Sequence, residues 1–115
     1  MPFSNIYQRR AAIRRHYYAN RQHYIEKNYR RREELRKYVR DLKMSTACKD
    51  CGESYPYYVM DFDHLENKEF SISRLVYANN KTKLRFELEK CEIVCANCHR
   101  IRTYERLVRA RSSVD

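Results

Sequence analysis

Two cysteine pairs, separated by 43 residues, constrain the fold of this chain more than any other feature. Cys48 and Cys51 form the first pair in CKDC, and Cys95 and Cys98 form the second in CANC. Each Cys-x-x-Cys turn directs two thiolates toward one tetrahedral ion, so two matched pairs are typical of a structural zinc site. The separation exceeds the roughly 15–20 residues of a simple zinc ribbon. It therefore predicts that zinc holds two distant hairpins together, with a functional insert between them.

The composition favours metal over disulfide as the use of these cysteines. The chain has 115 residues, enough for one small domain, with one Gly and no Trp. It contains neither an apolar run near the ~20 residues that cross a bilayer nor a signal-peptide core. A cytoplasmic setting is the expectation, and thiols there stay reduced and available to metal. The fifth cysteine, Cys91, stands at an apolar position in EKCEIVC, and we expect it to be a core thiol.

Positive charge is concentrated in the N-terminal part of the chain. The formal net charge is +10. Residues 1–43 hold 13 Lys and Arg against four Asp and Glu, whereas residues 44–115 are almost balanced, with 12 against 11. An excess of this kind favours a polyanionic partner, most commonly nucleic acid. A generally basic surface, a ribosomal protein and a membrane-surface protein are the alternatives.

Residues 1–43 are expected to form a basic helical arm. The segment from Arg9 to Lys43 contains no Gly or Pro, and its apolar residues recur at helical spacings. Ser4 or Asn5 is positioned to cap the helix. One helix over residues 5–43 would be about 58 Å long, so part of it must lie on a partner or in solvent. We interpret it as a nucleic-acid-binding arm; a solvated helix and a coiled-coil dimer remain alternatives. The arm residues expected to contact phosphates are Arg14, Arg15, Arg21, Arg30, Arg31 and Arg32.

Residues 44–115 are expected to form the compact part of the chain. The sequence predicts a strand over residues 55–62, a partner strand over 92–96, helical spacing around 81–91 and a last helix over 96–110. On that last helix, Ile101, Tyr104 and Val108 share one side. The other side carries a basic stripe of His99, Arg102, Arg106 and Arg109.

The sequence DFDH, residues 61–64, is a candidate for metal and proton chemistry. Asp63 offers hard oxygen ligands suited to a Mg²⁺-like ion, and His64 exchanges a proton near neutral pH. Adjacent side chains on a regular strand point to opposite faces, so joint action requires the strand to end or bulge here. An ordinary surface ion pair is the alternative.

Three motifs in register resemble a known family. CKDCG, DFDH and CANCHRIRT, in that order, resemble the HNH endonucleases of the His-Me finger (ββα-metal) group, in particular the phage and prophage type stapled by four cysteines. The resemblance covers residues 48–103. It implies an α+β fold with a small ββα-metal domain, which we assign to residues 44–115; the basic helical arm over residues 1–43 lies outside the resemblance.

The resemblance also implies roles for particular residues. His64 would be the general base that activates water for attack on a phosphodiester. Asp63 and His99 would hold one divalent cation, Mg²⁺ or Mn²⁺, while the four paired cysteines hold structural zinc. Arg100 and Arg102 would clamp phosphates of double-stranded DNA, with Arg106 and Arg109 further along the same helix.

The sequence departs from the family at one point. An Asn that many members carry ahead of the second cysteine pair is absent, since Lys90 and Cys91 stand there; Asn97 is a candidate substitute. Asp61 either supports a ligand by a hydrogen bond or ends the strand, and we favour the strand end.

Two other interpretations use the same scaffold. One is a non-catalytic zinc-containing module that binds nucleic acid. The other is a phage assembly or packaging accessory, whose arm binds a phage protein or a second copy of the chain. The resemblance places the protein in the cytoplasm of a bacterial or phage-infected cell.

Overall fold

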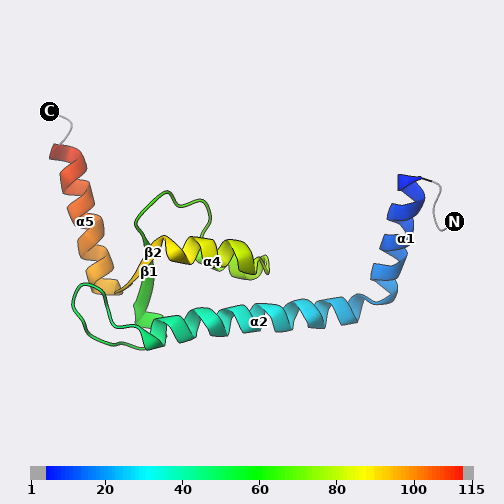
Figure 1. Cartoon of the computed structure of the whole chain (residues 1–115), viewed down its shortest axis with the longest axis horizontal. Helices are drawn as coiled ribbons and strands as arrows, with labels where there is room; N and C mark the ends of the chain where they lie inside the picture. Colours follow the sequence, from blue (N-terminus) through cyan, green and yellow to red (C-terminus); the bar gives the residue numbers. More distant parts are fainter. Residues whose placement is uncertain (1–4, 113–115) are drawn as a thin grey trace.

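The computed structural model describes residues 5–112, which form five α-helices, one short 3-10 helix and two strands (Figure 1). Within these residues the fold is α+β, as expected, with one antiparallel two-stranded sheet. The elements in chain order are α1 (Ile6–Ala19), α2 (Arg21–Ser45), η1 (Tyr57–Val59), β1 (Met60–His64), α3 (Ile72–Tyr77), α4 (Lys81–Glu89), β2 (Cys91–Cys95) and α5 (Ala96–Ser112).

The N-terminal arm is helical within the described residues, as expected, but it consists of two helices rather than a single one over residues 5–43. Asn5 caps α1 by accepting a hydrogen bond from the Gln8 amide at 2.9 Å, and Ser4 lies outside the described residues. The helix ends at Asn20, whose side chain donates to the His16 carbonyl at 2.9 Å. Such a local side-chain bond competes with helix continuation. The chain changes direction at Asn20, so the axis of α1 lies at an angle to the axis of α2 (Figure 1).

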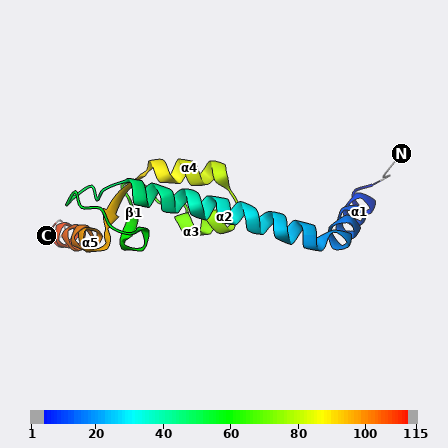
Figure 2. The same ribbon diagram turned by 90° about the horizontal axis from the view of Figure 1, so that it is seen from below.

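The second arm helix belongs to the hydrophobic core. Leu35 of α2 is buried against Leu75 and Val76 of α3 and Leu84 of α4. Arg32 adds a polar attachment, because its guanidinium stacks 4.3 Å from the Tyr77 ring centre and its Nε donates to the Tyr77 carbonyl. Figure 2 shows α3 and α4 alongside α2. The domain boundary between residues 43 and 44 stays a prediction. The packing of Leu35 joins α2 of the arm to α3 and α4 of the compact part.

Strands β1 and β2 form a regular antiparallel pair, which we call the hairpin although α3 and α4 lie between the two strands in the sequence. Met60 lies opposite Cys95, Phe62 opposite Ile93 and His64 opposite Cys91. The partner strand expected at 92–96 is confirmed within one residue. The strand expected over 55–62 is wrong in its first half, because residues after Pro56 form a 3-10 turn and β1 begins only at Met60.

The molecule is long and thin, with extents of 66, 38 and 17 Å. Helix α1 has no buried residue and projects at one end, while α5 projects at the other (Figure 1). Within residues 5–112, no helix combines the length and apolar character needed to cross a membrane.

Candidate functional site

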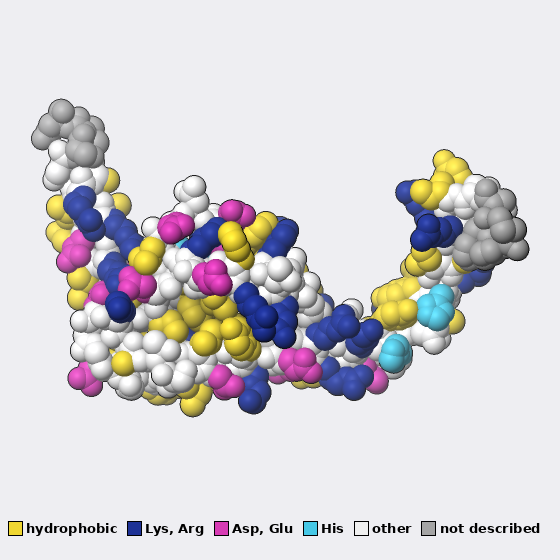
Figure 3. Space-filling view, in the orientation of Figure 1, with side chains coloured by type: hydrophobic (Ala, Val, Ile, Leu, Met, Phe, Trp, Pro, Cys, Tyr) yellow, Lys and Arg dark blue, Asp and Glu magenta, His cyan; other side chains and the backbone are white. Residues whose placement is uncertain are grey.

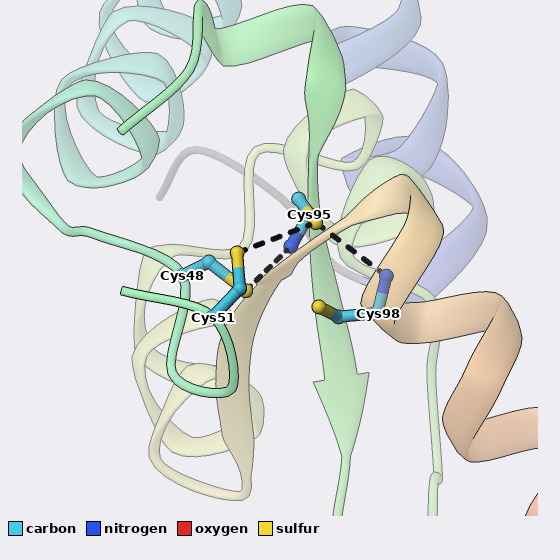
Figure 4. A group of neighbouring side chains, drawn as sticks. All are labelled: Cys48, Cys51, Cys95 and Cys98. Carbon is cyan, nitrogen blue, oxygen red and sulfur yellow. Dashed lines mark hydrogen bonds between the residues drawn. The ribbon is translucent and has the colours of Figure 1, made fainter. Parts of the chain in front are cut away.

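The four paired cysteines come together at one end of the hairpin (Figure 4). Cys48 and Cys51 lie on the turn after α2, Cys95 ends β2, and Cys98 lies in the first turn of α5. Their sulfur atoms all lie within 4.8 Å of one another. Tetrahedral zinc with Zn–S bonds of ~2.3 Å separates its sulfurs by about 3.8 Å. The arrangement can therefore hold a metal such as zinc.

Local backbone geometry prepares this cluster for a cation. Gly52 has a φ of +77°, a conformation that side chains disfavour, and its amide closes the knuckle on the Cys48 carbonyl at 2.9 Å. The Cys95 amide donates to Cys48 Sγ at 3.2 Å. Burial raises the pKa of Cys48, but amides of Cys51, Cys95 and Asp50 outweigh it and lower that pKa to about 6. The pKa of the Cys98 thiol is raised to about 12, first by the hydrogen bond of Cys98 with Cys95 and then by burial. A bound cation would allow all four sulfurs to be thiolates at once.

Cys91 stands apart from the four-cysteine cluster and is only half-buried, outside both hydrophobic core clusters, so the expectation of a core thiol is met only in part. Its Sγ donates to the Glu87 carbonyl at 3.3 Å, and burial raises its pKa from 9.0 to about 11. A thiol pKa that is higher in the folded state contributes stability that is lost as pH rises from about 9 to about 11.

This shift predicts slow alkylation of Cys91 in the zinc-loaded protein. With a pKa of about 11 when folded and 9.0 when unfolded, about one Cys91 in a thousand would be a thiolate at pH 8, against about one in ten after unfolding. Iodoacetamide should therefore label Cys91 about 100-fold more slowly in the folded protein than in urea, as followed by peptide mass spectrometry. Equal rates in the two states would contradict the burial of this thiol.

Asp63 is the most enclosed acid of the hairpin, with 3 % of its surface exposed. Both oxygens of its carboxylate are paired with α5. Arg106 donates to Oδ1 at 2.8 Å and to Oδ2 at 2.7 Å, and Arg102 donates to Oδ2 at 2.7 Å. These bonds, those of Arg106 foremost, outweigh burial and lower the pKa of Asp63 to about 2. Asp63 is therefore ionised at neutral pH.

His99 lies between two carboxylates of β1. Its Nε2 is 3.5 Å from Asp63 Oδ1, and its Nδ1 donates to Asp61 Oδ2 at 3.0 Å. Asp61 is the second residue of β1 and pairs with Val94, so the interpretation of Asp61 as the strand end is wrong. The contact of Asp61 with His99 matches the other alternative, a carboxylate that supports a candidate ligand by a hydrogen bond.

His64 is not part of this group. Strand β1 is regular through its last residue, His64, so His64 and Asp63 face opposite sides of the sheet. The side chain of His64 is 12 % exposed, and its Nε2 lies 3.2 Å from Glu87 Oε2 on α4. The structure thus brings Asp63 and His99 together on the α5 side, and His64 ends the strand on the α4 side.

The basic residues expected at a nucleic-acid surface divide into two groups. Arg102 and Arg106 are engaged by Asp63, and Arg102 also forms two hydrogen bonds with Asp50. Arg32 is engaged by Tyr77. The others have exposed side chains on the arm or on α5; they are Arg14, Arg15, Arg21, Arg30, Arg31, Arg100 and Arg109. Asn97 is exposed on α5.

The structure adds a basic cavity that sequence reasoning missed. A cavity of about 380 Å³ is lined by residues of α2, η1, β1 and α3. Lys43 lies 5.2 Å from the centre of the Phe62 ring, and Arg40 lies 5.5 Å from that of Tyr57. Figure 3 shows Lys and Arg side chains next to a hydrophobic patch above α2. The spacing of three and four residues between Arg36, Arg40 and Lys43 would have indicated one basic helix face. The cavity is lined by Arg36, Val39, Arg40, Lys43, Tyr57, Phe62, Ile72, Ser73, Val76 and Tyr77.

Comparisons with family models, with curated proteins and with solved structures found no match to this chain.

Proposed function

We propose that this protein is a metal-dependent endonuclease of the HNH type, which hydrolyses phosphodiester bonds in DNA. His64 acts as general base, Asp63 and His99 hold one divalent cation, and the four paired cysteines hold a structural zinc in a ββα-metal unit of β1, β2 and α5. The observation that carries the proposal is the 3.5 Å separation of Asp63 Oδ1 and His99 Nε2, directly beside the cysteine cluster.

The donor set fits a small divalent cation. A carboxylate oxygen and an imidazole nitrogen bound to one ion, each at roughly 2.1 Å, lie about 3 Å apart, close to the separation seen here. The bond from His99 Nδ1 to Asp61 supports this further, because a metal-bound His usually donates its other ring N–H to a carboxylate. When bound, Mg²⁺ or Mn²⁺ would stabilise charge on the scissile phosphate and on the leaving oxygen.

Arg102 and Arg106 neutralise Asp63 in the substrate-free protein. The side chain of Arg106 is 43 % exposed, whereas that of Arg102 is 14 % exposed and is also held by Asp50. A guanidinium binds phosphate as readily as carboxylate, often through two bonds. In this mechanism Arg106 moves from Asp63 to a DNA phosphate, while Arg102 keeps Asp63 oriented.

His64 is placed to act at the end of the strand. Its Cα is about 3.8 Å from that of Asp63, as for any neighbours in the chain. A phosphate lying across the end of β1 would therefore have His64 on one side and Asp63 with His99 on the other. Among the described residues Nδ1 of His64 has no hydrogen-bond partner, so this nitrogen is available to accept a proton from water.

The side of β1 that carries His64 offers DNA a basic surface. Phe62 precedes His64 by two residues and lines the cavity that carries Arg36, Arg40 and Lys43. Helices α1 and α2 carry further exposed arginines along the arm, namely Arg14, Arg15, Arg21, Arg30 and Arg31. Phosphate contacts of this kind supply affinity that depends steeply on salt.

A non-catalytic nucleic-acid-binding module is the second candidate. The ion pairs of Asp63 with Arg102 and Arg106 favour it, because they give the buried carboxylate a purely structural use. Incubation of supercoiled plasmid with the zinc-loaded protein separates the two. We expect nicked or linear DNA with Mg²⁺ or Mn²⁺ and none without added divalent ion. Salt-dependent binding without cleavage in any divalent ion tested would support the second candidate.

The basic cavity leads to a prediction for DNA affinity. Replacing Arg40 and Lys43 together with Gln should weaken duplex binding and reduce the slope of log affinity against log salt by about 2, or about 1 per lost phosphate contact. Lys37→Gln is the matched control, since Lys37 is exposed on the same helix, pairs with Asp41 and does not line the cavity. Fluorescence anisotropy over a salt series measures both. A slope for the double variant equal to that of Lys37→Gln would exclude the cavity from the DNA path.

A further inference from the structure

Glu87 is a buried acid that the mechanism above does not use. It lies on the inner face of α4 with 1 % of its surface exposed. Each carboxylate oxygen has its own partner: Oε1 accepts from Lys90 Nζ at 2.9 Å, and Oε2 lies 3.2 Å from His64 Nε2. A carboxylate is rarely buried so fully unless all of its acceptors are engaged.

Lys90 fixes the carboxylate in position. Its ammonium also donates to the Asn67 carbonyl at 3.2 Å and to Glu69 at 3.4 Å, so the loop after β1 holds it at two points. The Leu65 amide donates to the Lys90 carbonyl at 2.9 Å and ties the end of β1 to the end of α4. Glu87 and His64 therefore belong to one connected polar group.

The contact determines which nitrogen of His64 carries the proton. Lys90 foremost, and His64 to a smaller extent, hold the pKa of Glu87 below its usual range, so Glu87 is an ionised carboxylate that only accepts. Nε2 of His64 must then be the N–H donor. In neutral His64 this leaves the lone pair on Nδ1, the nitrogen without a partner among the described residues.

We infer that Glu87 is a positioning residue for His64: it holds the imidazole at the end of β1 with Nε2 protonated, so that Nδ1 faces the reaction as the base. This inference rests on the proposed nuclease function. Glu87 does not touch substrate or cation; it acts through the orientation and tautomer of His64, as a carboxylate behind a catalytic histidine commonly does.

The test compares Glu87→Gln with Glu69→Gln in the zinc-loaded full chain. Both variants remove a carboxylate from Lys90, but only Glu87 contacts His64. For Glu87→Gln we expect kcat to fall at least about 10-fold with KM for plasmid unchanged, whereas Glu69→Gln should stay near wild type. A purely structural ion pair would lower the melting temperature without separating kcat from KM. Glu87→Gln with the kcat of Glu69→Gln would overturn the inference.

A second measurement needs no variant. ¹⁵N NMR of the wild-type protein, at a pH where imidazoles are neutral, should find His64 protonated on Nε2, and Glu87→Gln should shift the tautomers toward a mixture. Protonation of wild-type His64 on Nδ1 would overturn the inference even if the variants unfold. If the wild-type protein cleaves no DNA, the nuclease proposal fails, and the tautomer of His64 alone then decides whether Glu87 positions it.

Discussion

Replacing His64 with alanine is expected to slow plasmid cleavage by about 10²–10⁴-fold, the usual contribution of a positioned general base. The zinc content and the affinity for DNA should stay at wild-type values, because His64 contacts neither the cysteine cluster nor the basic cavity. Initial rates of nicking at saturating Mg²⁺ measure the effect. His23→Ala is the control, since it removes an exposed histidine from α2.

Three results would contradict this account of His64. Equal nicking by the wild-type and His64→Ala proteins would show that water is activated without this side chain. A loss of zinc in the variant would mean that His64 supports the fold, so that its rate carries no mechanistic information. A loss confined to KM would assign His64 to binding.

Replacing Cys48 with serine is expected to abolish zinc binding and to unfold the hairpin end of the molecule. The cluster around it is small: Cys48, Met60, Val94 and Cys95 are its buried residues, and two of the four are cysteines of the site. In zinc-finger peptides, structural zinc contributes roughly 10–16 kcal/mol of apparent binding free energy, which is also folding free energy. A core of this size cannot replace that contribution. Elemental analysis and circular dichroism measure the two losses.

Cys91→Ser is the matched control for the zinc prediction. Cys91 begins β2, the strand that ends at the zinc ligand Cys95, but its sulfur bonds to the Glu87 carbonyl, so this variant should retain one zinc per chain and a folded spectrum. Cys48→Ser that still binds one equivalent of zinc and melts like the wild type would contradict a four-cysteine site. So would a wild-type protein that keeps its fold in excess chelator.

Local patterns in the sequence were sufficient for the parts of the fold set by short-range chemistry. The knuckle spacing of Cys95 and Cys98 predicted a metal-binding cluster, and the pattern after Cys91 predicted β2. The break at Asn20 was missed because Asn occurs both inside helices and at their ends, and only the formed bond to His16 separates the two cases. The burial of Leu35 could not be predicted either, because its buried partners lie 40 or more residues further along the chain.

In the candidate site, too, contacts between residues far apart in the sequence could not be predicted. The resemblance of DFDH and CANCHRIRT to HNH motifs implied that Asp63 and His99 hold one cation; that role stays a prediction, although the two side chains lie 3.5 Å apart. From the sequence, a hydrogen bond between Asp61 and a ligand was the less favoured of two alternatives, and nothing indicated that Arg102 and Arg106 would pair with Asp63 rather than face solvent. Glu87 gave no signal at all, because a Glu three residues before a Lys on a helix is usually an exposed ion pair. Tertiary packing of α4 on the end of β1 makes it a partner of His64.

Anomalous X-ray scattering from crystals of the zinc-loaded protein bound to a short DNA duplex and soaked in Mn²⁺ tests the central claim most directly, because DNA phosphate draws Arg106 away from Asp63 in the proposed mechanism. We expect a zinc peak among Cys48, Cys51, Cys95 and Cys98 and a separate manganese peak between the Asp63 carboxylate and the His99 imidazole. The manganese peak should vanish in His99→Ala crystals while the zinc peak remains. A protein that cleaves DNA in Mn²⁺ but shows no manganese between Asp63 and His99 would contradict the claim.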